Sequence, residues 1–155
     1  MIESKVFICE ENMGNIQLIK FKPADATFIK NNLPFYFKDN SVSNIRSIIN
    51  RWTNELGYCI LYNKEKVGII SLSQKDEGYS WGIAVIDKYQ NNGIASKAFQ
   101  LICAEAKKQC ITKIISSCKK SNTPSIKLHE KVGFKLVKEE TNAAGNEMLR
   151  WEINI

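Results

Sequence analysis

The chain has 155 residues, of which 44% are hydrophobic and 25% charged, a composition typical of an ordinary globular protein with one substantial core. No apolar run approaches the roughly 20 residues that a membrane-spanning helix needs, and residues 1–5 lack the basic and then apolar pattern of a signal peptide. We therefore expect one domain over residues 1–155, located in the cytoplasm and without a membrane partner.

The formal net charge of +6 favours an anionic partner. Nucleic acid is one such partner, but the lysines are spread along the chain without a basic arm or block, and a polyphosphorylated cofactor explains the charge equally well. The cysteines are odd in number and show no close Cys–Cys or Cys–His pair, so we expect neither disulfides nor a metal site, but reduced, buried thiols. They are Cys9, Cys59, Cys103, Cys110 and Cys118.

The first third of the chain predicts a hairpin followed by two helices. A turn signal at 12–15 separates the two strands, and Pro23 precedes the first helix. Ser41 or Ser43 can cap the second helix, and Gly57 ends it. The expected elements are strands over residues 5–9 and 16–21, a helix over 24–32, an aromatic loop over 33–37 and a helix to about Leu56.

From Tyr58 onward, hydrophobic residues tend to recur at every second position, as in β-strands. This spacing and the short links predict an antiparallel meander with a polar turn at 63–66. Ile94, Ala98 and Ile102 mark the apolar face of a long helix that closes with the lysines at 107–108. The strand after this helix must follow a crossover, so we expect it to be parallel to the strand before the helix. The expected elements are strands over residues 58–62, 67–72 and 79–86, a helix over 94–108 and a strand over 113–118.

Residues 122–125, Asn-Thr-Pro-Ser, predict the start of another helix, with Thr123 as its cap and Pro124 at its first position. Gly133 ends this helix. The last expected elements are strands over residues 134–137 and 147–153, joined by a polar loop at 142–146.

The junction at 85–96, where a buried strand passes through a polar turn into the long helix, has the chemistry of a phosphate site. Several backbone N–H groups in the first turn of a helix have no partner, and the helix dipole adds positive charge. Gly93 allows close approach, and Ala95 and Ser96 are small enough to leave the amides exposed. The alternative is a polar turn that happens to precede a helix.

This junction, with Gln90-x-x-Gly93-x-Ala95 at its centre, resembles the acetyl-coenzyme A signature of the GNAT acetyltransferase superfamily. Residues 122–134, Asn-Thr-Pro-Ser-Ile-Lys-Leu-His-Glu-Lys-Val-Gly-Phe, resemble the second motif of that superfamily, and the order of elements is similar as well. The resemblance implies an α/β (α+β) fold: a mixed, mostly antiparallel central sheet with one parallel pair at the cofactor site, flanked by about four helices.

The resemblance implies an N-acetyltransferase that moves the acetyl group of acetyl-CoA directly to a primary amine of a small molecule or a protein. Cys103 and Cys118 fall on core faces, so a covalent cysteine intermediate is not expected. The alternative of another class is a catalytically silent GNAT-like module that binds CoA as a sensor or scaffold. A third hypothesis, a basic nucleic-acid-binding domain, lacks a clustered basic face or an aromatic stacking motif.

For the cofactor, the resemblance implies that backbone amides of residues 90–96 hold the pyrophosphate and that the preceding strand end pairs with the pantetheine arm. A bulge splays that strand in the family, which frees an amide near Val85 for the thioester carbonyl. Asn122 is implied to contact the pantetheine or a water beside it; otherwise it is a loop asparagine before a helix cap. The implied cofactor-binding residues are Ile83, Ala84, Val85, Gln90, Asn91, Asn92, Gly93, Ile94, Ala95, Ser96, Asn122, Ser125 and His129.

Position 129 departs from the pattern of the family, which usually carries a tyrosine there as general acid near the sulfur. His129, the only histidine of the chain, takes that place. An imidazolium can donate a proton near neutral pH, so His129 is the candidate acid. The alternative is a packed or solvent-facing histidine in an enzyme that needs no dedicated acid.

The base is expected on the strand before the signature, where family members often carry a glutamate. Alignment from Gln90 places Tyr79 at that position, and Glu77 lies two residues earlier, on the same face of an extended strand. Glu77 is therefore the candidate base, directly or through water. The alternative is a solvated glutamate in the turn at 75–78.

The acceptor pocket of the family lies between the first two helices and the meander. Aromatic residues in these segments suit an apolar or stacking amine, although they can equally belong to the core. The candidate substrate-binding residues are Phe35, Tyr36, Phe37 and Trp81. The resemblance also admits a homodimer through an exposed last strand.

Overall fold

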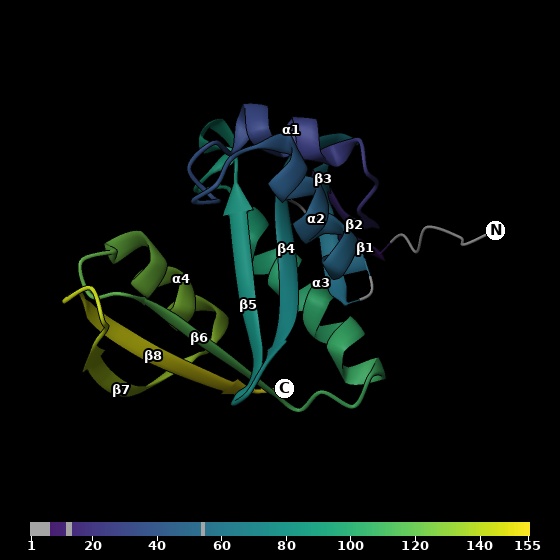
Figure 1. Cartoon of the computed structure of the whole chain (residues 1–155). Helices are drawn as coiled ribbons and strands as arrows, with labels where there is room; N and C mark the ends of the chain where they lie inside the picture. Colours follow the sequence, from purple (N-terminus) through teal and green to yellow (C-terminus); the bar gives the residue numbers. More distant parts are fainter. Residues whose placement is uncertain (1–6, 12–13, 54) are drawn as a thin grey trace.

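A mixed sheet of eight strands runs through the residues that the computed structural model describes, 7–11, 14–53 and 55–155 (Figure 1). Its order is β1-β2-β3-β4-β5-β6-β8-β7, and among the described strands only β5 and β6 pair in parallel. This confirms the predicted mostly antiparallel sheet with one parallel pair. The strands are β1 (Phe7–Glu11), β2 (Gly14–Lys20), β3 (Leu56–Tyr62), β4 (Glu65–Lys75), β5 (Gly78–Val85), β6 (Lys113–Lys119), β7 (Lys135–Thr141) and β8 (Glu147–Asn154).

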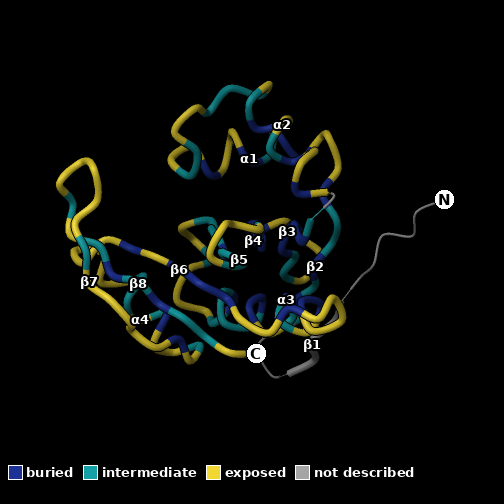
Figure 2. Tube along the Cα trace, turned by 60° about the horizontal axis from the view of Figure 1, so that its bottom comes forward, coloured by how far each residue is buried: buried dark blue, intermediate teal, exposed yellow. Residues whose placement is uncertain are grey.

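Helices cover both faces of this sheet. Figure 2 shows α1 and α2 on one side, and α3 and α4 on the other. None of the described helices has both the length and the apolar character to cross a membrane. The helices are α1 (Asp25–Asn32), α2 (Val42–Thr53), α3 (Ile94–Lys108) and α4 (Thr123–Val132), and a short 3-10 turn, η1 (Asp87–Tyr89), precedes α3.

The core has two halves because successive strand residues point to opposite faces of the sheet. On β3, Tyr58 packs on the α3 side, whereas Cys59 packs against α1 and α2. On β4, Ile70 and Ile69 divide in the same way. Strands β3 and β4 are therefore buried on both faces, which explains their nearly continuous apolar sequences.

The two parallel strands, β5 and β6, pair over only a short length and then diverge. Strands β5 and β6 pair only at Tyr79 with Ile114 and at Ser80 with Ile115, and beyond Ser80 the two strands separate (Figure 1). The expected bulge in β5 is wrong: the β4–β5 register is regular to Val85, and register shifts lie in the β3–β4 and β7–β8 pairs. The divergence of β5 from β6, and not a bulge, leaves the edge of β5 open.

Two helix boundaries differ from the prediction. Helix α2 ends at Thr53, and Gly57 lies within β3, where a Cβ would come within 2.6 Å of Trp52 Cβ. Gly57 therefore serves close packing and does not end the helix. The cap of α4 is Asn122, whose Oδ1 accepts the Ser125 N–H at 3.2 Å, and Thr123 is already the first residue of α4.

Other elements follow the prediction more closely. The N-terminal hairpin forms as β1 and β2, although residues 5, 6, 12 and 13 of the prediction lie outside the described residues. The last strand is not exposed at an edge, because β8 lies between β6 and β7. Among the described cysteines, Cys59 and Cys118 are buried, but Cys110 is exposed and Cys103 only half-buried, which corrects the expectation that all the thiols are buried.

Candidate functional site

Two residues in the left-handed backbone region shape the turn from β5 into α3. Asn91 has φ +63° and Gly93 has φ +73°, a conformation that glycine adopts freely and asparagine tolerates. Gly93 is the N-cap of α3, no side chain caps this end, and the first helical bond runs from Lys97 N–H to the Gly93 carbonyl at 3.2 Å. The amide groups of residues 94–96 are therefore available to a ligand.

Two polar side chains hold this loop from within. Gln90 Nε2 donates to the Val85 carbonyl at 3.0 Å and to Asp87 Oδ1 at 3.2 Å. Asn92 Nδ2 donates to the carbonyls of Tyr89 and Gln90 at 3.1 and 3.3 Å. These amide side chains fix the shape of the loop, which leaves ligand contacts to its backbone.

The open edge of β5 presents backbone groups to the gap. Ile86 N–H donates to the Val67 carbonyl of β4 at 2.8 Å. Because bonding to one neighbour alternates along an antiparallel strand, Ile83 and Val85 direct their N–H and C=O groups away from β4. The bond from Gln90 to the Val85 carbonyl agrees with this direction.

A groove of about 740 Å³ joins the two predicted motifs. It runs from the end of β5 over the loop and the first turn of α3 to the first turn of α4. All of the implied cofactor-binding residues line this groove except Asn92 and His129. Two basic residues of its wall, Lys127 and Lys131, were not predicted from the sequence, although their i,i+4 spacing on α4 was an available signal. The other lining residues that were not predicted are Leu33, Asp87, Tyr89, Thr123, Pro124 and Leu128.

His129 lies in the core and not in the groove. Its side chain is buried, with only 3% of the residue exposed, and its ring stacks on Trp151 at a centroid distance of 5.2 Å and an interplanar angle of 19°. Nε2 lies 2.7 Å from Ser116 Oγ, and Nδ1 lies 2.6 Å from the Ser125 carbonyl oxygen. Burial lowers the pKa of His129, while the bond to Ser125 opposes this shift.

These contacts contradict the role of His129 as a general acid at the sulfur. Both ring nitrogens have partners within the protein, and the lowered pKa disfavours the imidazolium that such an acid requires. Of the two interpretations of His129, the packed histidine is the one that the structure supports.

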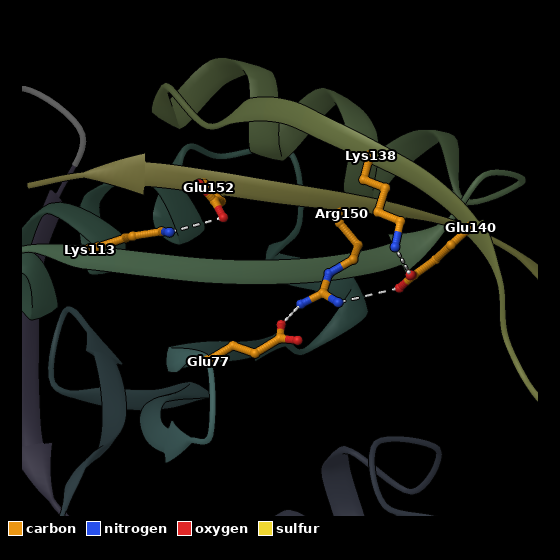
Figure 3. Close-up of polar contacts among 6 residues, drawn as sticks. All are labelled: Glu77, Lys113, Lys138, Glu140, Arg150 and Glu152. Atoms are coloured by element: carbon orange, nitrogen blue, oxygen red, sulfur yellow. Dashed lines mark hydrogen bonds and ion pairs between the residues drawn. The ribbon is translucent and has the colours of Figure 1, made fainter.

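Glu77 lies at the β4–β5 turn, at the end of β5 opposite to the groove. Eight positions along an extended strand separate it from Val85, a distance of roughly 25 Å. Its carboxylate forms an ion pair with Arg150 of β8, whose guanidinium also reaches Glu140 at 3.6 Å (Figure 3). The structure therefore contradicts Glu77 as a base beside the thioester, because the hairpin carries it away from the groove.

The four aromatic candidates separate into three environments. Trp81 is buried on the α3 side of the sheet, where it stacks on Phe134, so it is a core residue and not part of an acceptor pocket. Tyr36 and Phe37 pack edge to face at 4.8 Å in the segment after α1. Phe35, in the same segment, is 98% exposed.

Tyr36 reaches β5 from the side opposite to α3. A Cβ on Gly82 would overlap the Tyr36 hydroxyl, so the phenol lies directly against the backbone of β5. Burial raises the pKa of Tyr36 to about 12. The structure thus brings Tyr36 to the open part of β5, while Phe35 projects into solvent.

The chain is similar to known acetyltransferases. A family model, Acetyltransferase (GNAT) family, matches residues 26–134. No curated protein sequence matches the chain at a significant level.

Solved structures share the fold at low sequence identity. A GNAT-family acetyltransferase from Bacillus anthracis has 19% identity and a TM-score of 0.76, with 96% of this chain and 98% of that chain covered. RimJ of Mycobacterium smegmatis, solved in complex with CoA-disulfide, has 19% identity and a TM-score of 0.77, with coverages of 96% and 86%. An acetyltransferase from Salmonella typhimurium that modifies the N-terminal serine of ribosomal protein L7/L12 has 13% identity and a TM-score of 0.78, with coverages of 90% and 95%.

Proposed function

The chain belongs to the GNAT acetyltransferase family, and on this premise we propose that it transfers the acetyl group of acetyl-CoA directly to a primary amine. The observation that carries the proposal is the groove in which the uncapped first turn of α3 meets the open edge of β5 and the first turn of α4. The neighbouring RimJ was solved with CoA-disulfide, and the neighbour from Salmonella acts on a protein N-terminus. For this chain the acceptor is a small molecule or a protein amino group.

The chemistry of the groove fits acetyl-CoA. The free amides of residues 94–96 and the positive end of the α3 dipole suit a diphosphate, and Gly93 has no Cβ to obstruct it. Lys127 and Lys131 add positive charge to the wall, and the volume lies within the range of small-molecule sites. The backbone edge at Ile83 and Val85 suits the amides of an extended arm.

Bound acetyl-CoA supplies an activated thioester, whose carbonyl carbon accepts an amine and whose sulfur leaves. The N–H groups of Ile83 and Val85 face the gap and are the donors available to an oxygen that gains negative charge there. The N-terminal turns of α3 and α4 both line the groove, so their dipoles also favour negative charge. The chain needs no strong acid here, because a free thiol ionises near pH 8.5.

The described cysteines support direct transfer. None of them lines the groove, and burial raises the pKa of Cys103 to about 11, so a reactive thiolate is disfavoured. The one carboxylate in the groove wall, Asp87, is held by Gln90. We therefore assign removal of the amine proton to solvent, which implies a rate that rises with pH until the acceptor amine is neutral.

A silent CoA-binding module is the second candidate, and it is favoured by the absence of both Glu77 and His129 from the groove. Two measurements separate the candidates. Acetyl-CoA at saturating concentration is expected to raise the melting temperature, and release of free thiol is expected with at least one member of a panel of small amines and peptides with free amino termini. Binding without thiol release on any amine would favour the silent module, and no thermal shift with CoA or acetyl-CoA would refute both.

A further inference from the structure

His129 joins three elements that are distant in the sequence. Its ring belongs to α4, its Nε2 contacts Ser116 of β6, and its face stacks on Trp151 of β8. It is the one buried residue of α4, and only Phe134, just after the helix, is also buried in the second motif. His129 therefore lies in the core behind α4 and does not line the groove.

The hydrogen-bond partners fix the position of the ring proton. The Ser125 carbonyl oxygen can only accept, so Nδ1 carries the proton and donates to it. In the neutral imidazole, Nε2 is then the acceptor for the Ser116 hydroxyl at 2.7 Å. Each ring nitrogen is satisfied, and only the neutral imidazole gives this pattern with Ser116 as the donor.

The surroundings of the ring are aromatic and uncharged. Trp151 stacks on it, and Phe134 and Trp81 contact it with centroid distances of 5.1 and 5.7 Å. The charged neighbours of Trp151 face away from the ring: on β8, Arg150 and Glu152 flank Trp151 and so project from the other face of the sheet. Glu147 of β8 shares the face of Trp151 but lies four positions along the strand, roughly 13 Å away. The remaining charged groups of these elements are Lys113 and Lys119 on β6, Lys127, Glu130 and Lys131 on α4, and Lys97, Glu105, Lys107 and Lys108 on α3, where Lys108 pairs with Glu105.

The atom that His129 holds belongs to the groove wall. Ser125 lines the groove together with Asn122, and the Ser125 N–H donates to Asn122 Oδ1, which caps α4. The first turn of α4 is therefore fixed from two sides, by its cap at the surface and by the imidazole in the core. A shift of this turn changes the width of the groove.

We propose that His129 is a positioning residue, which as a neutral imidazole fixes the first turn of α4 against β6 and β8 and so sets how tightly the groove holds CoA. The inference rests on the proposed function, because it assigns CoA to the groove. It places His129 outside the reaction: the residue acts through Ser125 and touches no ligand. Protonation would put a charge among three aromatic rings, so the affinity for CoA falls as the pH falls.

The test compares His129→Leu with the unmodified protein. Leucine fills the core but makes neither hydrogen bond, so we expect the dissociation constant for CoA to rise roughly tenfold, with the loss on KM for acetyl-CoA and not on kcat. Isothermal titration calorimetry with CoA, well below the melting temperature of each protein, gives the constant. Ser116→Ala, which keeps the ring and removes its donor, is expected to weaken binding in the same direction by a smaller factor.

A stability-matched control separates positioning from general destabilisation. Leu149 lies two residues before Trp151, on the same face of β8, and belongs to the same core. Leu149→Ala opens a cavity there and is expected to lower the melting temperature while leaving the CoA dissociation constant unchanged. An equal loss of CoA affinity in Leu149→Ala would overturn the proposal. So would a His129→Leu protein that binds CoA as tightly as the unmodified protein.

The pH dependence supplies the second readout. The pKa of His129 is lowered from its ordinary value near 6.5, so the neutral form prevails above that value and is lost only as the pH falls below it. We expect affinity for CoA to fall more steeply below pH about 6.5 in the unmodified protein than in His129→Leu. Groups of CoA titrate equally in both proteins, so the difference between the two slopes reports on His129.

The outcomes distinguish this proposal from the proposed function. If the unmodified protein binds no CoA, both fail. If it binds CoA and identical pH slopes are found in the two proteins, only the positioning role of His129 fails. A drop in kcat at unchanged KM in His129→Leu also overturns it, because that result would return the ring to the reaction.

Discussion

The cofactor groove and the aromatic segment after α1 lie on either side of the open part of β5, and they are built from different parts of the chain. The groove presents backbone amides, held in place by the φ angles of Asn91 and Gly93. The other side presents a side chain, Tyr36, whose hydroxyl rests on Gly82. Under the proposed function, we expect the groove to bind the acetyl donor (the donor side) and the surface at Tyr36 to face the amine (the acceptor side). The donor side then depends on backbone conformation and the acceptor side on side-chain packing.

The largest expected effect is at Gly93. Gly93→Val places a β-branched side chain at φ +73°, which costs about 1–3 kcal/mol in strain and covers the amides of α3, so CoA binding is expected to fall by roughly 100-fold or more. Calorimetric titration with CoA measures the loss. Gly145→Val is the matched control, because Gly145 has φ +81° in the β7–β8 loop with open space around its Cβ position. Equal losses in the two variants would contradict the backbone role of the donor side.

On the acceptor side, Gly82→Ala is expected to displace Tyr36. The new Cβ overlaps the phenol oxygen, so we expect about 1–3 kcal/mol of lost stability and a changed rate with the acceptor amine, at an unchanged KM for acetyl-CoA. Thermal unfolding and free-thiol release measure the two effects. Adding Tyr36→Phe removes the overlapping atom, so the double variant is expected to recover much of the loss. Strictly additive effects would show that the two residues do not interact.

Lys131 tests whether side-chain charge also contributes on the donor side. Lys131→Ala is expected to weaken CoA binding about threefold, and less at high salt, because an exposed ion pair contributes at most about 1 kcal/mol. The control, Lys135→Ala on β7, removes the same charge outside the groove. If Lys131→Ala matched the effect of Gly93→Val, the donor side would depend on side chains after all.

The smallest effect is expected for Glu77→Gln. The residue is exposed and its ion pair with Arg150 lies at the far end of β5, so we expect turnover within a factor of about two and at most about 1 kcal/mol of lost stability. Steady-state kinetics at several pH values is the measurement. A large drop in kcat with a flattened alkaline limb would restore Glu77 as the base.

Local features of the fold were predictable because they depend on neighbouring residues. Periodicity placed α3 at Ile94–Lys108 and found both hairpins, and Gly133 ended α4 with φ +101°. The predicted element boundaries were wrong where a tertiary contact sets them. Gly57 was expected to end a helix, but it lies in β3, which packs closely on Trp52. The predicted cap of α4 was wrong by one residue. Asn122 and Thr123 are both good capping residues, and only the conformation of the folded turn selects Asn122.

For the proposed site, local sequence patterns were enough to predict the backbone features of its donor side. The polar turn, Gly93 and the first turn of α4 are local conformations, and residues close in the chain specify them. Long-range packing, in contrast, separates β5 from β6 after Ser80 and places Glu77 far from the groove. The surroundings of His129 also follow from long-range packing, and a histidine on a helix acquires its protonation state from the groups that fold against it. Those groups, Ser116 and Trp151, come from distant strands that no local pattern connects to α4.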